Sequence, residues 1–322
     1  MRSILVTGGA GYIGSHVAKA LASKGYVPVT LDNLSLGHAE AVKWGPFFEG
    51  DVGDPTLLRE IFQTHSIEGV IHLAALSNVR ESFEIPLTYY QNNVSNALTL
   101  LQVIQEFGPL PFVFSSTCAV YGIPKRLPLV ETHVKDPISP YGESKLMLEK
   151  ILESAHHAHA LPLAILRYFN AGGADPEGAI GENHSPETHL LPLLIQTALG
   201  KRKTFSLFGQ DHETPDGTPI RDFIHVTDLA EAHLLALEAL MEGKKMLTLN
   251  LGSGVGYSVQ EMIDAVEAYG GKPINIQIEE KFHGDPPILI ADSSQGKEVL
   301  GWAPRYSDLK TLIETAWKWQ VT

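Results

Sequence analysis

Hydrophobic and polar positions follow two different periods along the first half of the chain. Short apolar runs with the length of buried strands occur at residues 4–7, 27–31, 69–73, 111–115 and 163–166. Apolar side chains at helical spacing occupy the stretches at residues 55–64, 87–107 and 141–158. Strands that alternate with helices predict an α/β fold built on a parallel, doubly wound sheet of the Rossmann type.

Small and polar residues stand at the predicted strand ends. In such a sheet, ligands bind at the carboxyl ends of the strands. The residues that come just after a predicted strand are Gly8, Asp32, Asp51, Ala75 and Thr117. We therefore expect these residues to lie along one edge of the sheet and to face a ligand.

The first predicted strand runs directly into a glycine-rich turn, residues 8–14 with the sequence GGAGYIG. Gly8 allows a tight turn, Gly11 lets backbone amides approach a pyrophosphate, and Gly14 lets the following helix pack closely on the strand. The second strand leads into Asp32, whose carboxylate can accept hydrogen bonds from an adenosine ribose. This order of strand, turn, helix and acid predicts a dinucleotide site and favours NAD over NADP.

The regular alternation stops after Asn170. Residues 171–190 are rich in glycine, proline and acidic side chains and predict a long loop, a kind of segment that tends to be functional inside compact domains. The next stretches predict a helix, a strand, a turn-rich loop, and a strand leading into a long helix, at residues 191–199, 205–208, 210–219 and 222–240. We expect two interleaved domains. An NAD-binding Rossmann domain would comprise residues 1–172 and 222–254, and a smaller α/β domain for the substrate residues 173–221 and 255–322.

The chain carries a formal net charge of −13, and its longest basic run is residues 201–203. This charge argues against nucleic acid as a partner. An anionic ligand would have to be held by local cations, for which Arg221, Arg167 and Lys145 are candidates. The single cysteine, Cys118, excludes an internal disulfide, and no apolar run reaches membrane-spanning length. We expect a cytoplasmic protein that does not bind a membrane.

The most informative pair of side chains is Tyr141 and Lys145. A spacing of four puts both on one face of a helix, so that an ammonium group can sit beside a phenol. An unperturbed phenol has a pKa of about 10, and a nearby cation favours its ionised form. A positively charged nicotinamide would act in the same direction, so the pair predicts a tyrosine base. Upstream, the hydroxyls of residues 115–117 end a strand, and Thr117 among them can hydrogen-bond a substrate oxygen.

These motifs, in this order, resemble the extended short-chain dehydrogenase/reductase superfamily. They comprise the glycine turn, the Ser115-Ser116-Thr117 strand end followed by Val120-Tyr121-Gly122, and Tyr141-x-x-x-Lys145. Later motifs narrow the resemblance to the UDP-glucose 4-epimerase family. They lie at residues 167–170 (RYFN), 180–182 (IGE), 208–209 (FG), 216–226 (DGTPIRDFIHV), 250–254 (NLGSG) and 284–287 (GDPP). The likeness covers essentially the whole chain.

The resemblance implies reversible epimerisation at carbon 4 of a UDP-hexose, UDP-galactose to UDP-glucose, through a 4-keto sugar and with tightly bound NAD. It assigns Tyr141 as the base, Lys145 as the ribose contact that also tunes the phenol pKa, and Thr117 as the hydroxyl that binds the reacting oxygen. The residues that would contact NAD are Gly8, Gly11, Tyr12, Ile13, Gly14, Asp32, Asn33, Asp51, Val52, Ala75, Asn93, Lys145 and Phe169. Those that would contact the UDP-sugar are Thr117, Tyr141, Asn170, His189, Leu190, Arg221, Asp285 and Leu289, with Arg221 against the diphosphate. The resemblance also implies a homodimer.

Four positions are informative because of the residues that occupy them. Phe282 occupies the place of a second phosphate-binding arginine that is usual in the family. Cys118 and Ala119 stand where the 4,6-dehydratases of the superfamily carry an acidic pair, so an elimination would lack its acid and base. In the family, a tyrosine at the position of Leu289 narrows the sugar pocket. Leucine therefore predicts room for a 2-acetamido group, unless Leu289 only packs in the core.

Two other functions stay open. One is an epimerase or decarboxylase of the same superfamily that acts on a UDP-pentose or UDP-uronic acid. The other is a non-catalytic, NAD-sensing regulatory protein, which the presence of both Tyr141 and Lys145 argues against. No carboxylate or cysteine completes a tetrahedral set of ligands with the histidines at 156, 157 and 159, so we predict no metal site.

Overall fold

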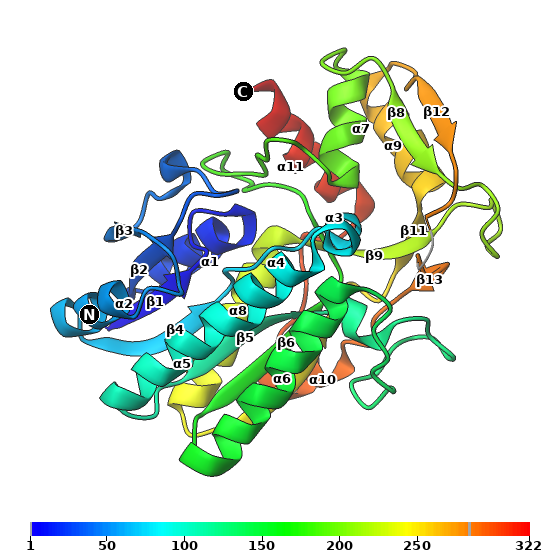
Figure 1. Ribbon diagram of the computed structural model, residues 1–322. Helices are drawn as coiled ribbons and strands as arrows, with labels where there is room; N and C mark the ends of the chain where they lie inside the picture. The colour runs from blue at the N-terminus through cyan, green and yellow to red at the C-terminus, as the bar shows by residue number, and fades with distance from the viewer. Residues whose placement is uncertain (1, 283–284) are drawn as a thin grey trace.

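The computed structural model describes residues 2–282 and 285–322, and its central layer is a seven-stranded sheet (Figure 1). Its neighbouring strands are all parallel, in the order β10-β6-β5-β4-β1-β2-β3. The strands are β1 (Ser3–Thr7), β2 (Val27–Asp32), β3 (Phe47–Glu49), β4 (Ile67–His72), β5 (Phe112–Thr117), β6 (Leu163–Tyr168) and β10 (Met246–Leu251). The strand order reverses at β1, which creates a crevice at the carboxyl ends of β1 and β4. The predicted fold class is confirmed.

Helices cover both faces of this sheet. One face carries α1 (Tyr12–Ser23) and α8 (Val226–Met241), and the other carries α2 (Pro55–Thr64), α5 (Asn96–Phe107) and α6 (Pro140–His159). Figure 1 shows α5 and α6 on the near face, with α8 behind the strands. Ile4 and Val6 are buried on one face and Leu5 on the other. Burial on both faces explains why the strands read as continuous apolar runs.

A second group of elements has a core of its own. Three helices, α7 (Leu190–Ala198), α9 (Val259–Gly270) and α11 (Leu309–Val321), pack with a two-stranded sheet of β8 (Phe205–Phe208) and β12 (Ile276–Glu279). A small sheet joins this group to the first, and it contains β7 (Asn170–Gly172), β9 (Ile220–His225), β11 (Gly256–Ser258) and β13 (Ile288–Leu289). One segment of the predicted substrate domain packs elsewhere, because α10 (Ser294–Leu300) and Trp302 lie against α8 and β10. The predicted domain boundaries stay a prediction.

The helix predicted at residues 87–107 is interrupted. The structure has α3 (Val79–Glu84), α4 (Pro86–Tyr90), a π-helical turn (Gln91–Ser95) and then α5. The π turn contains one extra residue, and within it Asn93 points inward. Its side-chain oxygen accepts a hydrogen bond from the Leu76 N–H, and its side-chain nitrogen donates one to the Leu76 carbonyl oxygen. Short 3-10 helices at Ala39–Ala41 and Cys118–Tyr121 complete the elements.

The predicted strand ends were close but not exact. Gly8 directly follows β1, whereas Asp32 and Thr117 are the last residues of β2 and β5. Asp51 and Ala75 lie slightly beyond the ends of β3 and β4. The predicted loop at residues 171–190 begins with the end of strand β7, which was missed because three residues give no period to detect.

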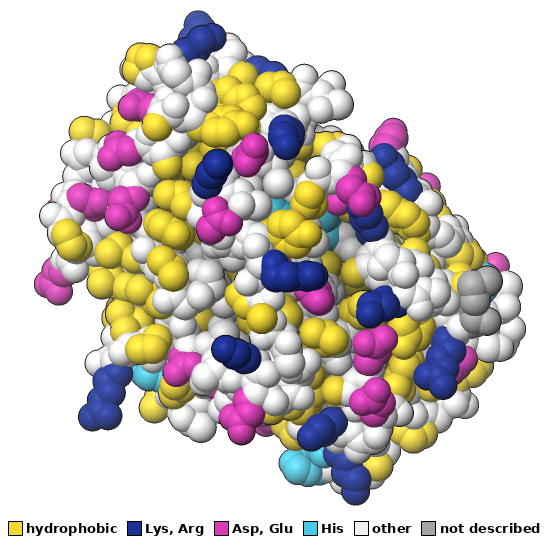
Figure 2. Space-filling model, turned by 180° about the vertical axis from the view of Figure 1, so that it is seen from behind, with side chains coloured by type: hydrophobic (Ala, Val, Ile, Leu, Met, Phe, Trp, Pro, Cys, Tyr) yellow, Lys and Arg dark blue, Asp and Glu magenta, His cyan; other side chains and the backbone are white. Residues whose placement is uncertain are grey.

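The surface carries charges of both signs. Figure 2 shows that lysine and arginine side chains are scattered among acidic ones on the face turned away in Figure 1. None of the helices within residues 2–282 and 285–322 is long and apolar enough to cross a membrane.

Candidate active site

The glycine turn after β1 closes tightly under α1. Gly8 has φ at 72°, in the left-handed region, and a Cβ there would lie 2.7 Å from the backbone nitrogen of Ala74. A Cβ on Gly14 would lie 2.0 Å from the carbonyl oxygen of Gly8, so α1 touches the turn directly. Gly11 is the N-cap of α1 and has no side chain to cover the first N–H groups of the helix. Such a cradle suits a pyrophosphate.

Asp32 lies beside this cradle at the end of β2. Its carboxylate accepts hydrogen bonds from the backbone N–H groups of Ala10, at 3.0 Å, and Leu34, at 2.8 Å. Burial raises the pKa of Asp32, and these two bonds oppose the rise. Each carboxylate oxygen keeps a further lone pair, so Asp32 can still accept hydrogen bonds from ribose hydroxyls.

Most of the residues predicted to contact NAD line one cleft at this edge of the sheet. They are Gly8, Gly11, Tyr12, Ile13, Gly14, Asp32, Asn33, Asp51, Val52, Ala75 and Lys145. Two predicted contacts lie elsewhere. Asn93 is buried behind the cleft, where it accepts a hydrogen bond from the Leu76 N–H at 2.9 Å and donates one to the Ser144 hydroxyl at 3.0 Å. Phe169 lines a second, neighbouring cleft.

The first turn of α6 places Tyr141 at the strand edge. Ser139 is the N-cap, and its hydroxyl accepts a hydrogen bond from the Gly142 N–H at 3.1 Å. Pro140 occupies the first helical position, where its fixed φ suits the helix. The phenol of Tyr141 thereby meets the hydroxyl of Thr117 at the end of β5. Burial raises the pKa of Tyr141 well above its usual range, the nearby phenol of Tyr168 adds to the rise, and the Thr117 hydroxyl opposes it.

Lys145 is buried one helical turn beyond Tyr141. Its Nζ donates a hydrogen bond to the carbonyl oxygen of Ser115 at 2.9 Å, and burial lowers its pKa to about 7. The lowered phenol pKa predicted from the spacing of the pair is therefore not found in the protein alone. Burial dominates both groups, because it penalises the phenolate and the ammonium alike. The prediction named a second positive charge that would lower the phenol pKa, that of the nicotinamide of bound NAD.

All residues predicted to contact the UDP-sugar line the second cleft. They are Thr117, Tyr141, Asn170, His189, Leu190, Arg221, Asp285 and Leu289. Tyr12, Ile13, Tyr141 and His189 line both clefts. The two clefts therefore meet at Tyr141, which can face a ligand in each.

Comparison with known proteins agrees with this arrangement. The sequence profile described as "NAD dependent epimerase/dehydratase family" matches residues 4–252. The chain belongs to this family. The UDP-glucose 4-epimerase of Rhizobium leguminosarum bv. trifolii is 49% identical over 317 residues, which are 98% of this chain and 97% of that relative.

Solved structures of the family are equally similar. The crystal structure of UDP-glucose 4-epimerase from Brucella ovis in complex with NAD has a TM-score of 0.94 and 46% identity, and the match covers 99% of this chain and 98% of that one. The enzyme of Bifidobacterium longum, in complex with NAD+ and UDP, also has a TM-score of 0.94, at 36% identity with the same coverage. The cofactor of this family member is NAD, as predicted.

Of the predicted anion-binding arginines, only Arg221 reaches the second cleft. It lies on β9, and its guanidinium pairs with Asp285 and donates to the carbonyl oxygen of Ile220 at 2.8 Å. Arg167 is not available to a ligand, contrary to expectation. Its Nε and Nη2 donate to both carboxylate oxygens of Glu149, at 2.8 and 2.7 Å, and the pair is buried.

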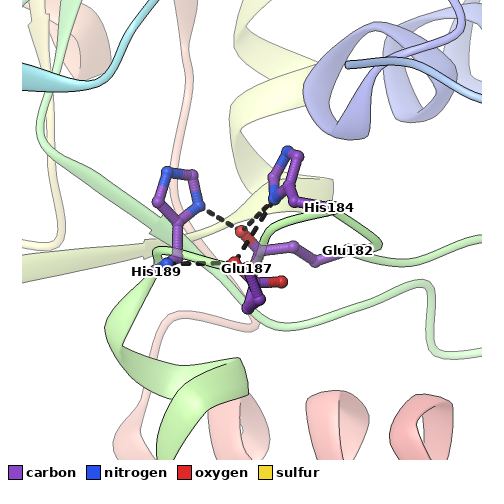
Figure 3. A group of neighbouring side chains, drawn as sticks. All are labelled: Glu182, His184, Glu187 and His189. Carbon is purple, nitrogen blue, oxygen red and sulfur yellow. Dashed lines mark hydrogen bonds and ion pairs between the residues drawn. The ribbon is translucent and has the colours of Figure 1, made fainter. Parts of the chain in front are cut away.

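Four side chains of the loop before α7 form a cluster, shown in Figure 3. Glu182, His184, Glu187 and His189 each offer a ligand atom, and these atoms lie within 4.8 Å of one another, so the group could hold a metal ion. This group was not considered in the sequence-based prediction of no metal. Burial lowers the pKa of His189, but the carboxylates of Glu182 and Glu187 outweigh it and raise the pKa to about 9. In the absence of a metal ion, the raised pKa keeps the imidazole of His189 protonated at neutral pH, and the group is then an ion-pair network.

Tyr168 and Arg80 are among the residues of the clefts that the sequence analysis missed. Tyr168, the last residue of β6, lines both clefts, and its hydroxyl forms a hydrogen bond with the Ser115 hydroxyl. Its place in the RYFN motif at a strand end was a usable signal. Arg80, on α3, lines the second cleft, and no motif marks it.

Proposed function

We propose that this protein interconverts UDP-galactose and UDP-glucose by inverting carbon 4 of the sugar, with NAD as a tightly held cofactor. The observation that carries the proposal is the meeting of the two clefts at Tyr141, where the phenol and the Thr117 hydroxyl stand together. One cleft has the cradle of a dinucleotide, and the other has a guanidinium for a phosphate. The similarity to UDP-glucose 4-epimerases over nearly the whole chain supports the same reaction.

The first cleft fits NAD by its shape and its donor set. Cβ atoms at Gly8 and Gly14 would collide with the backbone of the turn, so only glycine leaves the cradle intact. The N–H groups at the start of α1 would hold the pyrophosphate, Asp32 the adenosine ribose, and Lys145 the nicotinamide ribose. The chemistry that NAD supplies when bound is the reversible oxidation of carbon 4 to a 4-keto sugar.

Tyr141 exchanges the proton of the sugar's 4-hydroxyl. The ionised phenol takes this proton as carbon 4 is oxidised, and the phenol returns it as carbon 4 is reduced. Thr117 holds the reacting oxygen beside the phenol. Because burial raises the pKa of Tyr141, its ionisation depends on positive charge nearby, and Lys145, one helical turn away and lining the same cleft, supplies such a charge when its amine is protonated.

Inversion requires the sugar to present both faces to the same site. The 4-keto sugar must turn about its link to the diphosphate while the UDP stays bound. Anchoring must therefore be strong at the UDP and weak at the sugar. Arg221 supplies a phosphate anchor in the second cleft, and Leu190 and Leu289 give the same cleft apolar surface without directional bonds.

Leu289 supports a finer proposal about the sugar. It is buried beside Phe169 in a small core, yet it also lines the second cleft. Leucine is shorter than the tyrosine that narrows this pocket in relatives, so we propose that UDP-N-acetylglucosamine and UDP-N-acetylgalactosamine are also interconverted. We further propose a cytoplasmic homodimer, which light scattering after size-exclusion chromatography and cell fractionation would test.

A panel of UDP-sugars tests the function. Purified protein without added NAD should interconvert UDP-galactose and UDP-glucose, and NAD should be released from the protein on denaturation, because each cycle regenerates it. Conversion of only UDP-pentoses or UDP-uronic acids would replace the proposed substrate. Stoichiometric consumption of NAD would indicate a dehydrogenase.

A further inference from the structure

We propose that Arg80 is a diphosphate-binding residue of the second cleft, supplied by α3 and acting with Arg221. The proposal rests on the proposed function, since it names a residue that binds its UDP-sugar. It also bears on Phe282, the position at which the family resemblance leads us to expect a second phosphate-binding arginine.

Arg80 lies on α3, and its guanidinium contacts β8, which belongs to the second group of elements. It lies over the ring of Phe208 on β8, with its central carbon 3.5 Å from the ring centroid, and 5.3 Å from the centroid of Phe282. Phe282 in turn packs edge to face against Phe83 of α3, at 5.6 Å between centroids. The two aromatic rings hold the guanidinium at the second cleft, which Arg80 and Phe282 both line.

The charge of Arg80 is not neutralised by an ion pair. Within the described parts of the chain, its side chain has no hydrogen-bond partner, and no carboxylate oxygen lies within 4.0 Å of it. Asp285 is near enough to influence Arg80, but its carboxylate is paired with Arg221. Cation–π contacts leave the N–H donors at the edge of a guanidinium available, and a guanidinium stays charged at all ordinary pH values.

Arg80 and Arg221 together match the charge of a diphosphate. Arg221 alone has one carboxylate partner already, so the pair of residues Arg221 and Asp285 contributes little net charge. A UDP-sugar carries about two negative charges on its diphosphate. A half-buried, unpaired cation in the same cleft compensates this charge, and its planar donors suit phosphate oxygens.

The test measures binding of UDP and of uridine to the NAD-loaded protein with Arg80→Gln, Arg80→Lys and, as a matched control, Arg126→Gln, an exposed arginine that lines neither cleft. Calorimetry should show UDP affinity at least tenfold weaker in Arg80→Gln, partly recovered in Arg80→Lys, and unchanged in Arg126→Gln. Uridine affinity, measured by NMR titration, should stay within twofold throughout, since uridine has no phosphate. KM for the UDP-sugar should rise with little change in kcat.

Several outcomes would overturn the proposal. UDP affinity within twofold of wild type in Arg80→Gln would do so, as would an equal loss of uridine and UDP affinity, which would indicate a structural role. Loss of NAD from Arg80→Gln would indicate that Arg80 serves the first cleft, which binds NAD, and would also contradict the proposal. The two proposals fail separately. If UDP binding depends on Arg80 but no UDP-hexose is turned over, only the proposed function is contradicted. If a UDP-hexose is turned over and Arg80→Gln has unaltered UDP affinity, only the proposed role of Arg80 is contradicted.

Discussion

The Nζ atom of Lys145 donates a hydrogen bond to the carbonyl oxygen of Ser115 at 2.9 Å, and so ties helix α6 to the end of strand β5. Tyr141 stands one turn before Lys145 on α6, and Thr117 two residues after Ser115 on β5. The bond therefore keeps the phenol beside the threonine hydroxyl. The same lysine is buried, so its charge acts in surroundings of low polarity.

Tyr141→Phe should retain fold and cofactor and lose turnover. Only a hydroxyl is removed from a buried ring, while the proton acceptor for the 4-hydroxyl disappears. We expect kcat to fall by roughly 10²- to 10⁴-fold. Turnover of UDP-galactose and NAD content after denaturation would be compared with those of Tyr257→Phe, a tyrosine outside both clefts. Near-normal turnover with NAD bound would show that Tyr141 is not the base.

Lys145→Met should reduce NAD retention and shift the pH profile. The base works when the phenol is ionised, above its pKa, and a nearby cation lowers that pKa. Removing the cation should therefore raise the phenol pKa, so activity is lost at a higher pH as the solution is acidified. The test is the pH dependence of kcat with saturating NAD. An unmoved acidic limb would mean that the lysine has no electrostatic role.

Arg167→Met should destabilise the fold. It would leave the carboxylate of Glu149 buried without its partner, at a cost of about 3–5 kcal/mol in the free energy of unfolding. Replacing both residues by methionine should cost less than the single change, because no charge then remains buried. Urea denaturation measures both. The exposed pair Arg59 and Glu106 is the control, and breaking it should matter little. A double variant as unstable as Arg167→Met would contradict this account.

Leu289→Tyr should lower the turnover of N-acetyl sugars relative to plain hexoses. The added ring and hydroxyl would occupy the part of the second cleft that leucine leaves open. The ratio of UDP-N-acetylglucosamine to UDP-glucose turnover would be measured in wild type, Leu289→Tyr and the similarly sized Leu289→Met. The same ratio in all three would mean that Leu289 acts only in core packing.

Removing divalent metals should change neither activity nor NAD content. The cluster of Glu182, His184, Glu187 and His189 contains its own counter-charge, because the pKa of His189 is raised to about 9. Dialysis against EDTA followed by the epimerase assay is the test, with elemental analysis of the untreated protein alongside. A stoichiometric metal whose removal stops turnover, and whose return restores it, would contradict the prediction.

Local pattern was enough for the fold class and for the centre of the site. The apolar runs, the glycine turn and the Tyr141–Lys145 spacing depend on residues close together in the chain, and periodicity reports such relations directly. Helix α2 has the bounds that its apolar spacing predicted, and the structure shows Asp54 capping its start with Pro55 at the first helical position. The break before α5 escaped prediction, since a π turn keeps the same apolar spacing on either side.

The sequence by itself determined which chemistry this protein can perform, and the tertiary structure decided which charges are free to take part in it. Arg167 and Arg80 are the same residue type, yet one is buried against Glu149 and the other faces the substrate cleft between two aromatic rings. Their partners lie far away in the chain, so no local pattern could tell the two arginines apart. The pKa values of Tyr141 and Lys145 follow the same rule, because the cost of burying a charge is set by everything packed around it.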